Sequence, residues 1–237
     1  DFLIHGDDNS NDISTEKLII FPRTEGVCSS DIRKKSFNII NNIKRNILLN
    51  PGPATTTDTV KIAQVVPDIC PREKEFGDVM EFVSDELTKI VADVREFSTV
   101  LFGGSGTAAV ESIITSVVPF DKTILIVNNG AYGQRMIEIS KRFKIKYIEF
   151  KSSSIEPVDI KKLEEVLNSN SNISHLAVIH NETTTGLLND LDRLGKLSNK
   201  YSVDLIVDAM SSYAALPIDM KKQNISFLAA SSNKNIQ

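Results

Sequence analysis

Runs of consecutive apolar residues recur along the second half of the chain and are typical of buried strands. They lie at residues 99–102, 123–127, 176–179, 204–207 and 227–230, and a further strand is predicted at residues 146–150, where Lys146 and Glu149 interrupt the apolar residues. Apolar residues at three- and four-residue spacing, which indicate helices, separate several of these runs, at residues 108–114, 160–167 and 191–201. Because strands that alternate with helices form sheets covered on both faces, the pattern predicts an α/β fold with a mostly parallel sheet and helices on both faces.

Upstream of this alternation, the pattern predicts a long helix and a domain boundary. Apolar residues recur at helical spacing over residues 74–97, and we expect them to lie in the core. A short apolar strand at residues 47–49 ends at a Pro-Gly-Pro turn, because proline cannot continue a strand. A helical pattern at residues 36–46 precedes it. We therefore predict a domain remnant with a helical linker over residues 1–46 and a second, incomplete domain over residues 47–237.

Residues 1–35 differ from the rest of the chain in their predicted secondary structure. Strands are predicted at residues 2–4 and 17–21, and a polar loop separates them. Ser29 or Ser30 can cap a helix that begins at Asp31, since a serine hydroxyl accepts from the free N–H groups of the first turn. A helix N-terminus beside an arginine favours anion binding.

Composition narrows the class of protein. The net charge is −4, so no basic surface indicates a nucleic-acid partner. No apolar run approaches the roughly 18 residues of a membrane span. The chain has two cysteines without paired spacing, which favours neither a disulfide framework nor a metal site. We expect a cytoplasmic protein, and also a fragment, because the chain begins inside a predicted strand and ends three residues after Lys234.

Two of the predicted strands deliver polar side chains with complementary chemistry. Asp208 follows the run at residues 204–207, and Lys234 follows the run at residues 227–230. Ligands of open α/β sheets bind outside the carboxyl ends of the strands, so both side chains should face one crevice. A carboxylate that keeps a ring nitrogen protonated and an amine that forms a Schiff base are what pyridoxal phosphate (PLP) requires.

A glycine-rich turn, Gly103-Gly104-Ser105-Gly106-Thr107, stands between a predicted strand and a predicted helix. Glycines permit close backbone approach, and the helix N-terminus offers free N–H groups and a positive dipole end, so the turn can hold a phosphate. The hydroxyls of Ser105 and Thr107 add donors. Other readings of the turn are weaker, because it lacks the Gly-Lys-Thr of a P-loop and the last glycine of a nucleophile elbow. A dinucleotide fingerprint would need an acid where Asn128 stands.

Two further strand exits carry candidate ligand contacts. Tyr132 lies between small residues in the exit turn after residues 123–127, where its ring can cover a flat ligand. The run at residues 176–179 leads into His-Asn-Glu-Thr-Thr-Thr-Gly, and Thr183 is the candidate hydrogen-bonding residue there. Each of these positions also suits an ordinary turn, so the prediction depends on their combination.

In combination, these stretches resemble the fold-type I PLP enzymes, in particular the small class-V aminotransferases that include alanine–glyoxylate and serine–pyruvate transaminases. The resemblance covers residues 47–237 and rests on Asn50-Pro51-Gly52-Pro53, Gly104-Ser105-Gly106-Thr107, Asn129-Gly130-Ala131-Tyr132-Gly133, Glu182-Thr183-Thr184-Thr185-Gly186, Asp208-Ala209-Met210-Ser211-Ser212 and Ser231-Ser232-Asn233-Lys234. It implies a PLP-transferase large domain whose small C-terminal domain is missing.

The resemblance also implies roles for single residues. Lys234 would form the Schiff base and shuttle a proton, and Asp208 would pair with the ring nitrogen. Ser105, Gly106 and Thr107 would hold the phosphate. Tyr132 would stack on the ring, and Thr183 would bind its phenolic oxygen.

The branch that the chain is similar to transfers the amino group of 2-aminoethylphosphonate to pyruvate, which gives phosphonoacetaldehyde and alanine. The resemblance therefore implies an aminophosphonate and pyruvate as small-molecule substrates, and a homodimer as the working form. Another class-V aminotransferase, of alanine–glyoxylate or serine–pyruvate type, is the alternative. A cysteine desulfurase is disfavoured, because that class has histidines where Asn233 and Tyr132 stand.

Residues 1–35 resemble a different family, the CTP-dependent nucleotidyltransferases that activate choline phosphate or glycerol phosphate. The resemblance rests on His5-Gly6-Asp7 and on Arg23-Thr24-Glu25-Gly26-Val27-Cys28-Ser29-Ser30-Asp31-Ile32, with Cys28 in place of the usual serine. The paired-histidine phosphate motif of that family does not occur in the sequence. The resemblance therefore implies the inactive tail of a fused domain, and an inactive fragment of a bifunctional enzyme is a further alternative for the whole chain.

Overall fold

The computed structural model describes residues 3–6, 18–21 and 46–236. The chain divides into two compact units, Asp1–Ile47 and Leu48–Gln237, each of which is described here by itself. The division lies next to the start that the sequence predicts for the second domain. Within the described ranges, no helix is both long enough and apolar enough to cross a membrane.

In the first unit, strand β1 (Leu3–Gly6) pairs in parallel with strand β2 (Leu18–Phe21). Both strands agree with the sequence prediction. The anion site near Asp31, the unusual Cys28 and the linker helix at residues 36–46 lie outside the described residues, apart from Asn46. They stay predictions, as does the relation of this segment to nucleotidyltransferases.

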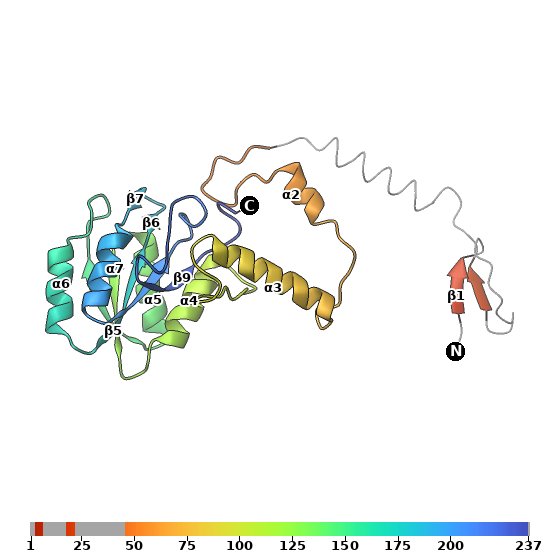
Figure 1. Ribbon diagram of the computed structural model, residues 1–237. Coiled ribbons are helices and arrows are strands. Elements are labelled where there is room, and N and C mark those ends of the chain that lie inside the picture. The colour runs from red at the N-terminus through yellow and green to blue at the C-terminus, as the bar shows by residue number, and fades with distance from the viewer. Residues whose placement is uncertain (1–2, 7–17, 22–45, 237) are drawn as a thin grey trace. The chain divides into compact units, whose positions relative to one another are not determined.

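The second unit is built on a five-stranded, fully parallel sheet with the strand order β4-β3-β5-β8-β9, which confirms the predicted fold (Figure 1). Its strands are β3 (Thr123–Asn128), β4 (Lys146–Lys151), β5 (Ile173–Ile179), β8 (Asp204–Asp208) and β9 (Ile225–Ala229). From β3 the chain moves outward to β4 and then returns to β5 on the other side of β3. Such a reversal of strand order is where open α/β sheets bind ligands.

Helices cover both faces of this sheet, as predicted. Helices α4 (Gly106–Val117) and α5 (Ala131–Arg142) pack on one face, and α6 (Ile160–Ser169) and α7 (Leu191–Lys200) pack on the other. Successive strand side chains point to opposite faces, so Ile124 joins the α4–α5 core whereas its neighbour Leu125 joins the α6–α7 core. This explains why the central strands β3, β5 and β8 carry consecutive apolar residues.

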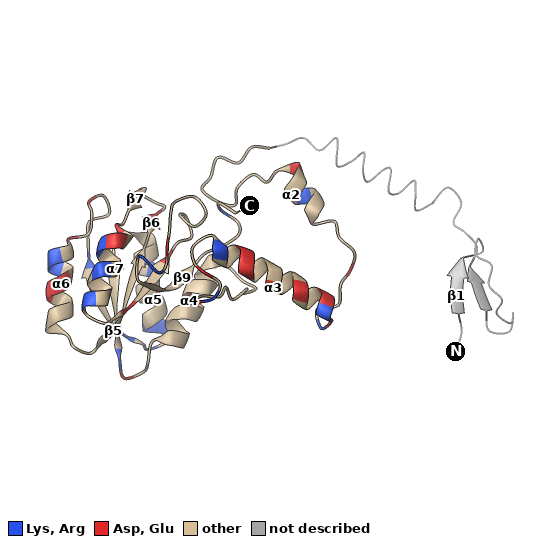
Figure 2. Cartoon of the chain, viewed as in Figure 1, with Lys and Arg blue, Asp and Glu red and all other residues tan. Residues whose placement is uncertain are grey.

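In the second unit, the helices carry more of the charged residues than the strands do. Figure 2 shows residues of both signs along α6, α7 and α3 (Lys74–Lys89), whereas most of the central strand surface is uncharged. This distribution is expected for helices that cover a sheet with one face and meet water with the other. A short antiparallel pair, β6 (Asn181–Glu182) with β7 (Leu187–Leu188), follows the end of β5.

Upstream of α4, one prediction is right in part and two are wrong. The long helix begins at Lys74 as predicted but ends at Lys89. Its side chains Val79, Met80 and Phe82 are exposed, with Phe82 at 66%, although Leu87 packs against the core. Residues 47–49 and 99–102 are not strands, and Val100 is 83% exposed. An apolar run becomes a strand only where another strand pairs with it, and no described strand runs beside either segment. Short helix α2 (Asp58–Ala63) and the start of α3 stand away from the sheet (Figure 1).

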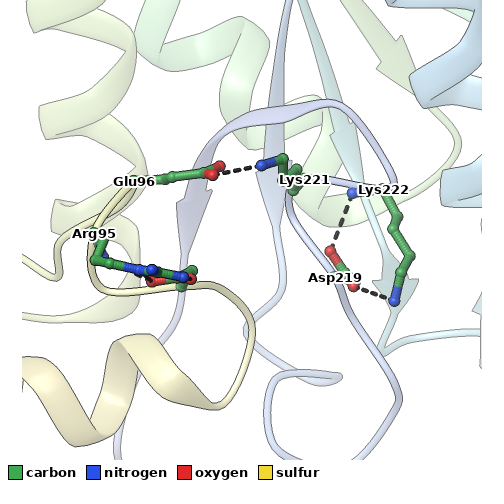
Figure 3. A network of polar contacts seen from close by, with 6 residues as sticks. Arg95, Glu96, Asp219, Lys221 and Lys222 are labelled. Atoms are coloured by element: carbon green, nitrogen blue, oxygen red, sulfur yellow. Dashed lines mark hydrogen bonds and ion pairs between the residues drawn. The ribbon is translucent and has the colours of Figure 1, made fainter.

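The segment after α3 is fastened to the loop that precedes β9. Lys221 forms an ion pair with Glu96 within the charged network of Figure 3. The Met220 N–H donates to the Val91 carbonyl at 2.9 Å, and Val91 is buried in the core. Exposed ion pairs contribute little to stability, so the backbone bond and the buried valine fix this connection.

Candidate active site

Asp208 is the last residue of β8, and its side chain is only 6% exposed. Its Oδ1 accepts a hydrogen bond from the Met210 N–H at 2.9 Å. Burial raises the pKa of the carboxyl to about 6, while the Met210 N–H and the charge of Lys234 act in the opposite direction. A buried carboxyl group with so little compensation is suited to a cationic partner.

Lys234 lies in the loop after β9, and its side chain reaches back toward the strand ends. Its Nζ donates to Ser211 Oγ at 2.9 Å and lies 5.7 Å from the centre of the Tyr132 ring. The Pro-Gly-Pro turn packs against the same loop. A Cβ on Gly52 would lie 2.8 Å from Lys234 Cγ, and the Ala54 N–H donates to the Asn233 carbonyl at 3.0 Å. Glycine at residue 52 therefore leaves room for the lysine chain.

Ser211 connects the lysine to the loop after β5. Its Oγ shares a 2.5 Å hydrogen bond with Thr183 Oγ1, in addition to the bond from Lys234. The structure thus brings two predicted site residues together through a hydroxyl that the sequence reasoning assigned no role. Ser211 lies in the stretch Asp208-Ala209-Met210-Ser211-Ser212, and nothing in the sequence distinguishes it from Ser212.

The glycine-rich turn forms the N-terminus of α4, which begins at Gly106, two residues earlier than predicted. Ser105 caps the helix, and its Oγ accepts from the Ala108 N–H at 3.2 Å. A Cβ on Gly106 would lie 2.6 Å from Met210 Sδ, so the helix start packs closely on the residues that follow Asp208. The free N–H groups of the first turn therefore lie near the Asp208 strand end.

Tyr132 lies in the first turn of α5, not in a strand-exit turn as predicted, because the helix already begins at Ala131. The Arg135 guanidinium lies 5.2 Å from the centre of the Tyr132 ring and donates to Thr107 Oγ1 at 3.1 Å. Two cations, Arg135 and Lys234, thus lie within cation–π range of one ring. Contacts lead from Thr107 through Arg135 and Tyr132 to Lys234.

Glu182 is a buried acid that the sequence reasoning did not select. Its side chain is fully buried, and it accepts hydrogen bonds from the Tyr132 N–H at 3.3 Å and from Thr184 Oγ1 at 2.7 Å. A Cβ on Gly130 would lie 2.4 Å from the Glu182 carboxyl carbon. The carboxylate therefore fastens the start of α5 to the loop that carries Thr183.

His180 is a second buried ionisable group that the sequence did not reveal. Its Nδ1 shares a 2.8 Å hydrogen bond with Ser212 Oγ, and its backbone N–H donates to the Asp208 carbonyl at 2.9 Å. Burial lowers the pKa of the imidazole to about 4, so it is neutral near pH 7. It packs behind the Asp208 strand end as an uncharged group.

The predicted site residues fall into one connected set. Ser211 contacts both Lys234 and Thr183, and Arg135 contacts both Tyr132 and Thr107. Met210 connects Asp208 with Gly106 at the start of α4, which Ser105 caps. The individual roles of these residues stay predictions. Within the described residues, no group of three or more histidine, cysteine or acidic side chains is placed to hold a metal ion.

Two curated relatives share most of the second unit. The bifunctional phosphonoacetaldehyde hydrolase/aminoethylphosphonate transaminase of Clostridioides difficile (strain 630) is 40% identical over 192 residues, which are 81% of this chain and 30% of the relative. The 2-aminoethylphosphonate–pyruvate transaminase of Salmonella agona (strain SL483) is 38% identical over 192 residues, with 81% and 52% coverage. The chain therefore spans about half or less of the length of these relatives.

Solved structures share the fold. An alanine–glyoxylate aminotransferase from Nostoc sp. superposes with a TM-score of 0.75 at 24% identity, over 81% of this chain and 50% of that one. A pyridoxamine–pyruvate aminotransferase from Mesorhizobium loti gives a TM-score of 0.73 at 23% identity, with 81% and 48% coverage. The sequence profile of the PLP-dependent family described as Aminotransferase class-V matches residues 61–237. With most of its length matched in this way, the chain belongs to the class-V aminotransferase family.

Proposed function

We propose that this chain provides the cofactor-binding part of an enzyme that transfers the amino group of 2-aminoethylphosphonate to pyruvate with the help of PLP. The observation that carries the proposal is the meeting of Lys234, Thr183 and Tyr132 beside the buried carboxyl of Asp208. The names of the two curated relatives support the choice of substrates.

The residues present fit this cofactor. A cationic ring nitrogen beside Asp208 would stabilise the ionised carboxylate, which burial alone disfavours. Lys234 supplies the amine that reacts with the cofactor aldehyde, and the Ser211 hydroxyl already holds that amine. When bound, PLP supplies an electron sink for the bonds of the amino-bearing carbon.

The remaining residues position the ligand. Tyr132, set in the first turn of α5, presents its ring beside Lys234, where it can cover the flat face of the cofactor. Thr183 offers a hydroxyl that now bonds Ser211 and can bond the phenolic oxygen. The first turn of α4, with Ser105, Gly106 and Thr107, offers N–H and hydroxyl donors to the phosphate.

We also propose that the working form is a homodimer. The segment from residue 47 to the end of α3 carries several exposed large apolar side chains, among them Leu49 at 95% and Val65 at 74%. A second copy that covered them would remove this apolar surface from water. Light scattering on the purified protein would give twice the chain mass if the proposal is right. A cytoplasmic location stays a prediction from the cysteine content.

The first experiment tests the cofactor. The chain is incubated with PLP and reduced with borohydride, and the labelled peptides are identified by mass spectrometry. We expect the label on Lys234 and its loss in Lys234→Ala, with no loss in Lys196→Ala, which removes an exposed lysine of α7. A label spread over surface lysines in both variants would contradict the proposal.

The second experiment tests the substrate. The PLP-loaded protein is mixed with single amino donors, and conversion of the cofactor to its amine form is followed by absorbance. We expect 2-aminoethylphosphonate to convert it faster than alanine or serine. The opposite order would show that the chain belongs to an enzyme with a different amino donor.

A further inference from the structure

We infer that Arg135 binds the phosphate group of the cofactor, as the charged member of a phosphate site whose other members are neutral. This inference rests on the proposed function and adds a residue to it. Arg135 lies outside the glycine-rich turn and outside the stretches that carry the resemblance to known aminotransferases.

The position of Arg135 is the first line of evidence. It lies on the exposed side of α5, one helical turn after Tyr132. Its guanidinium donates to Thr107 Oγ1 at 3.1 Å and lies over the Tyr132 ring, with 5.2 Å to the ring centre. These contacts hold the cation at the start of α4, where the phosphate is expected.

The second line of evidence is the lack of an anionic partner. In the part of the chain that the structure describes, Arg135 forms no ion pair. Arg142 and Arg193 form none there either, but Arg135 is held against the predicted site residues Thr107 and Tyr132. Its hydrogen bond goes to a neutral hydroxyl and its stacking contact to a neutral ring. An arginine held in this way keeps its charge available to an incoming anion.

The third line of evidence is the charge of the ligand. A phosphate monoester carries close to two negative charges at pH 7, yet Ser105, Gly106 and Thr107 contribute no formal charge. The N-terminus of α4 contributes a partial charge of about +0.5. Lys234 reacts with the aldehyde of the cofactor in the proposed function, so its charge is not available to the phosphate. Arg135 is the described cation placed to supply the balance, and its planar donors suit phosphate oxygens.

The test compares PLP with pyridoxal, which has the same ring and aldehyde but no phosphate. Binding of each to Lys234 is measured by absorbance titration and by borohydride trapping in the wild type, Arg135→Gln, Arg135→Lys and Arg142→Gln. Arg142 lies at the end of the same helix, so its variant loses the same charge away from the site.

We expect Arg135→Gln to weaken PLP binding about tenfold, as for the loss of one charge-assisted hydrogen bond. Pyridoxal binding should not change, because pyridoxal lacks the group that the guanidinium contacts. Arg135→Lys should restore part of the PLP affinity, and Arg142→Gln should match the wild type. Added salt should reduce the preference for PLP over pyridoxal in the wild type more than in Arg135→Gln.

Two results would overturn the inference while the proposed function stands. The first is an unchanged PLP affinity in Arg135→Gln; if the response to 2-aminoethylphosphonate alone is then weaker, the guanidinium contacts the substrate phosphonate instead. The second is an equal loss for PLP and pyridoxal, which would show that Arg135 only supports packing around Tyr132. If neither ligand labels Lys234 in the wild type, the proposed function itself fails, and the inference fails with it.

Discussion

Asp208 and His180 should affect stability in opposite directions over the same pH range. The folded chain raises the pKa of Asp208 from 3.8 to about 6, so Asp208 keeps its proton longer in the folded state than in the unfolded state. Stability from this group is therefore lost as the pH rises from about 4 to 6. The loss amounts to about 3 kcal/mol, at 1.36 kcal/mol for each pKa unit.

His180 has the opposite sign. Burial lowers its pKa from 6.5 to about 4, so the folded state resists protonation that the unfolded state accepts. Stability from this group is present above about pH 6.5 and is lost as the pH falls toward 4, again by about 3 kcal/mol. The two contributions therefore largely cancel in the wild type. Their sum in the free energy of unfolding should change little between pH 4 and 6.5.

Removing one group should expose the other. In Asp208→Asn, the free energy of unfolding should rise by about 3 kcal/mol relative to the wild type between pH 4 and 7, because the asparagine cannot ionise. In His180→Gln, it should fall by a similar amount relative to the wild type over this range. The double variant should again run parallel to the wild type, since both opposing terms are removed.

The assay is urea unfolding followed by circular dichroism at several pH values, without added PLP. Other ionisable groups are common to all four proteins, so they drop out of the differences between the pH profiles. Profiles of Asp208→Asn and the wild type that run parallel would show that Asp208 is ionised normally in the folded chain. That result would also remove the argument that the carboxyl awaits a cationic partner.

Three further predictions concern packing and contacts around the site. In urea unfolding, Gly195→Ala in α7 should destabilise the chain by about 2 kcal/mol or more, because the new Cβ would lie 1.8 Å from a backbone oxygen of the loop before β9. Gly77→Ala in α3 should instead stabilise the chain by up to about 1 kcal/mol, because its new Cβ would meet no atom within 4 Å. Glu182→Gln should lower the free energy of unfolding by about 1–3 kcal/mol, because one carboxylate oxygen that accepts from a backbone N–H becomes a donor; an unchanged value would show that this contact is not formed. Ser211→Ala should slow borohydride trapping of PLP without changing the free energy of unfolding by more than about 0.5 kcal/mol, and an equal rate would mean that the hydroxyl does not orient the lysine.

The sequence predicted the sheet well because both of its faces are buried. Strand β3, the second half of β5, and strands β8 and β9 are mostly apolar, and this signal is local, whereas the edge strand β4 carries Lys146, Glu149 and Lys151. Helix α5 was missed because Gly130 and Gly133 suggested a turn. Gly133 is needed for close packing instead, since a Cβ there would lie 2.9 Å from the Val127 carbonyl oxygen.

The failures upstream of α4 have a common cause. Residues 47–49 and 99–102 are mostly apolar, and residues 74–97 carry an apolar face, but in the structure much of this apolar surface is exposed. An apolar pattern indicates that a surface is to be buried, but it does not identify the element that buries it. The pattern was therefore read as core where the described chain offers no sheet or helix to complete it.

The candidate site was predictable as far as its residues follow strands. Asp208, Tyr132 and Thr183 come at or soon after strand ends, so the topology alone brings them to one edge of the sheet. Glu182 and Arg135 act through contacts with residues distant in sequence. Those contacts depend on the start and rotation of α5, a helix that the sequence pattern did not reveal.

The charges at this edge of the sheet suggest why the ligand must carry charges of both signs. Asp208 and Arg135 are of opposite sign, yet in the described residues neither forms an ion pair with the other or with a third residue. Neutral groups hold them instead, namely the Met210 N–H in one case and Thr107 with Tyr132 in the other. A direct ion pair would stabilise the free chain but would satisfy both charges internally. Holding them apart keeps a buried carboxylate for a cation and an accessible guanidinium for an anion, and PLP, with a ring nitrogen that can be protonated and a phosphate, offers both on one rigid molecule.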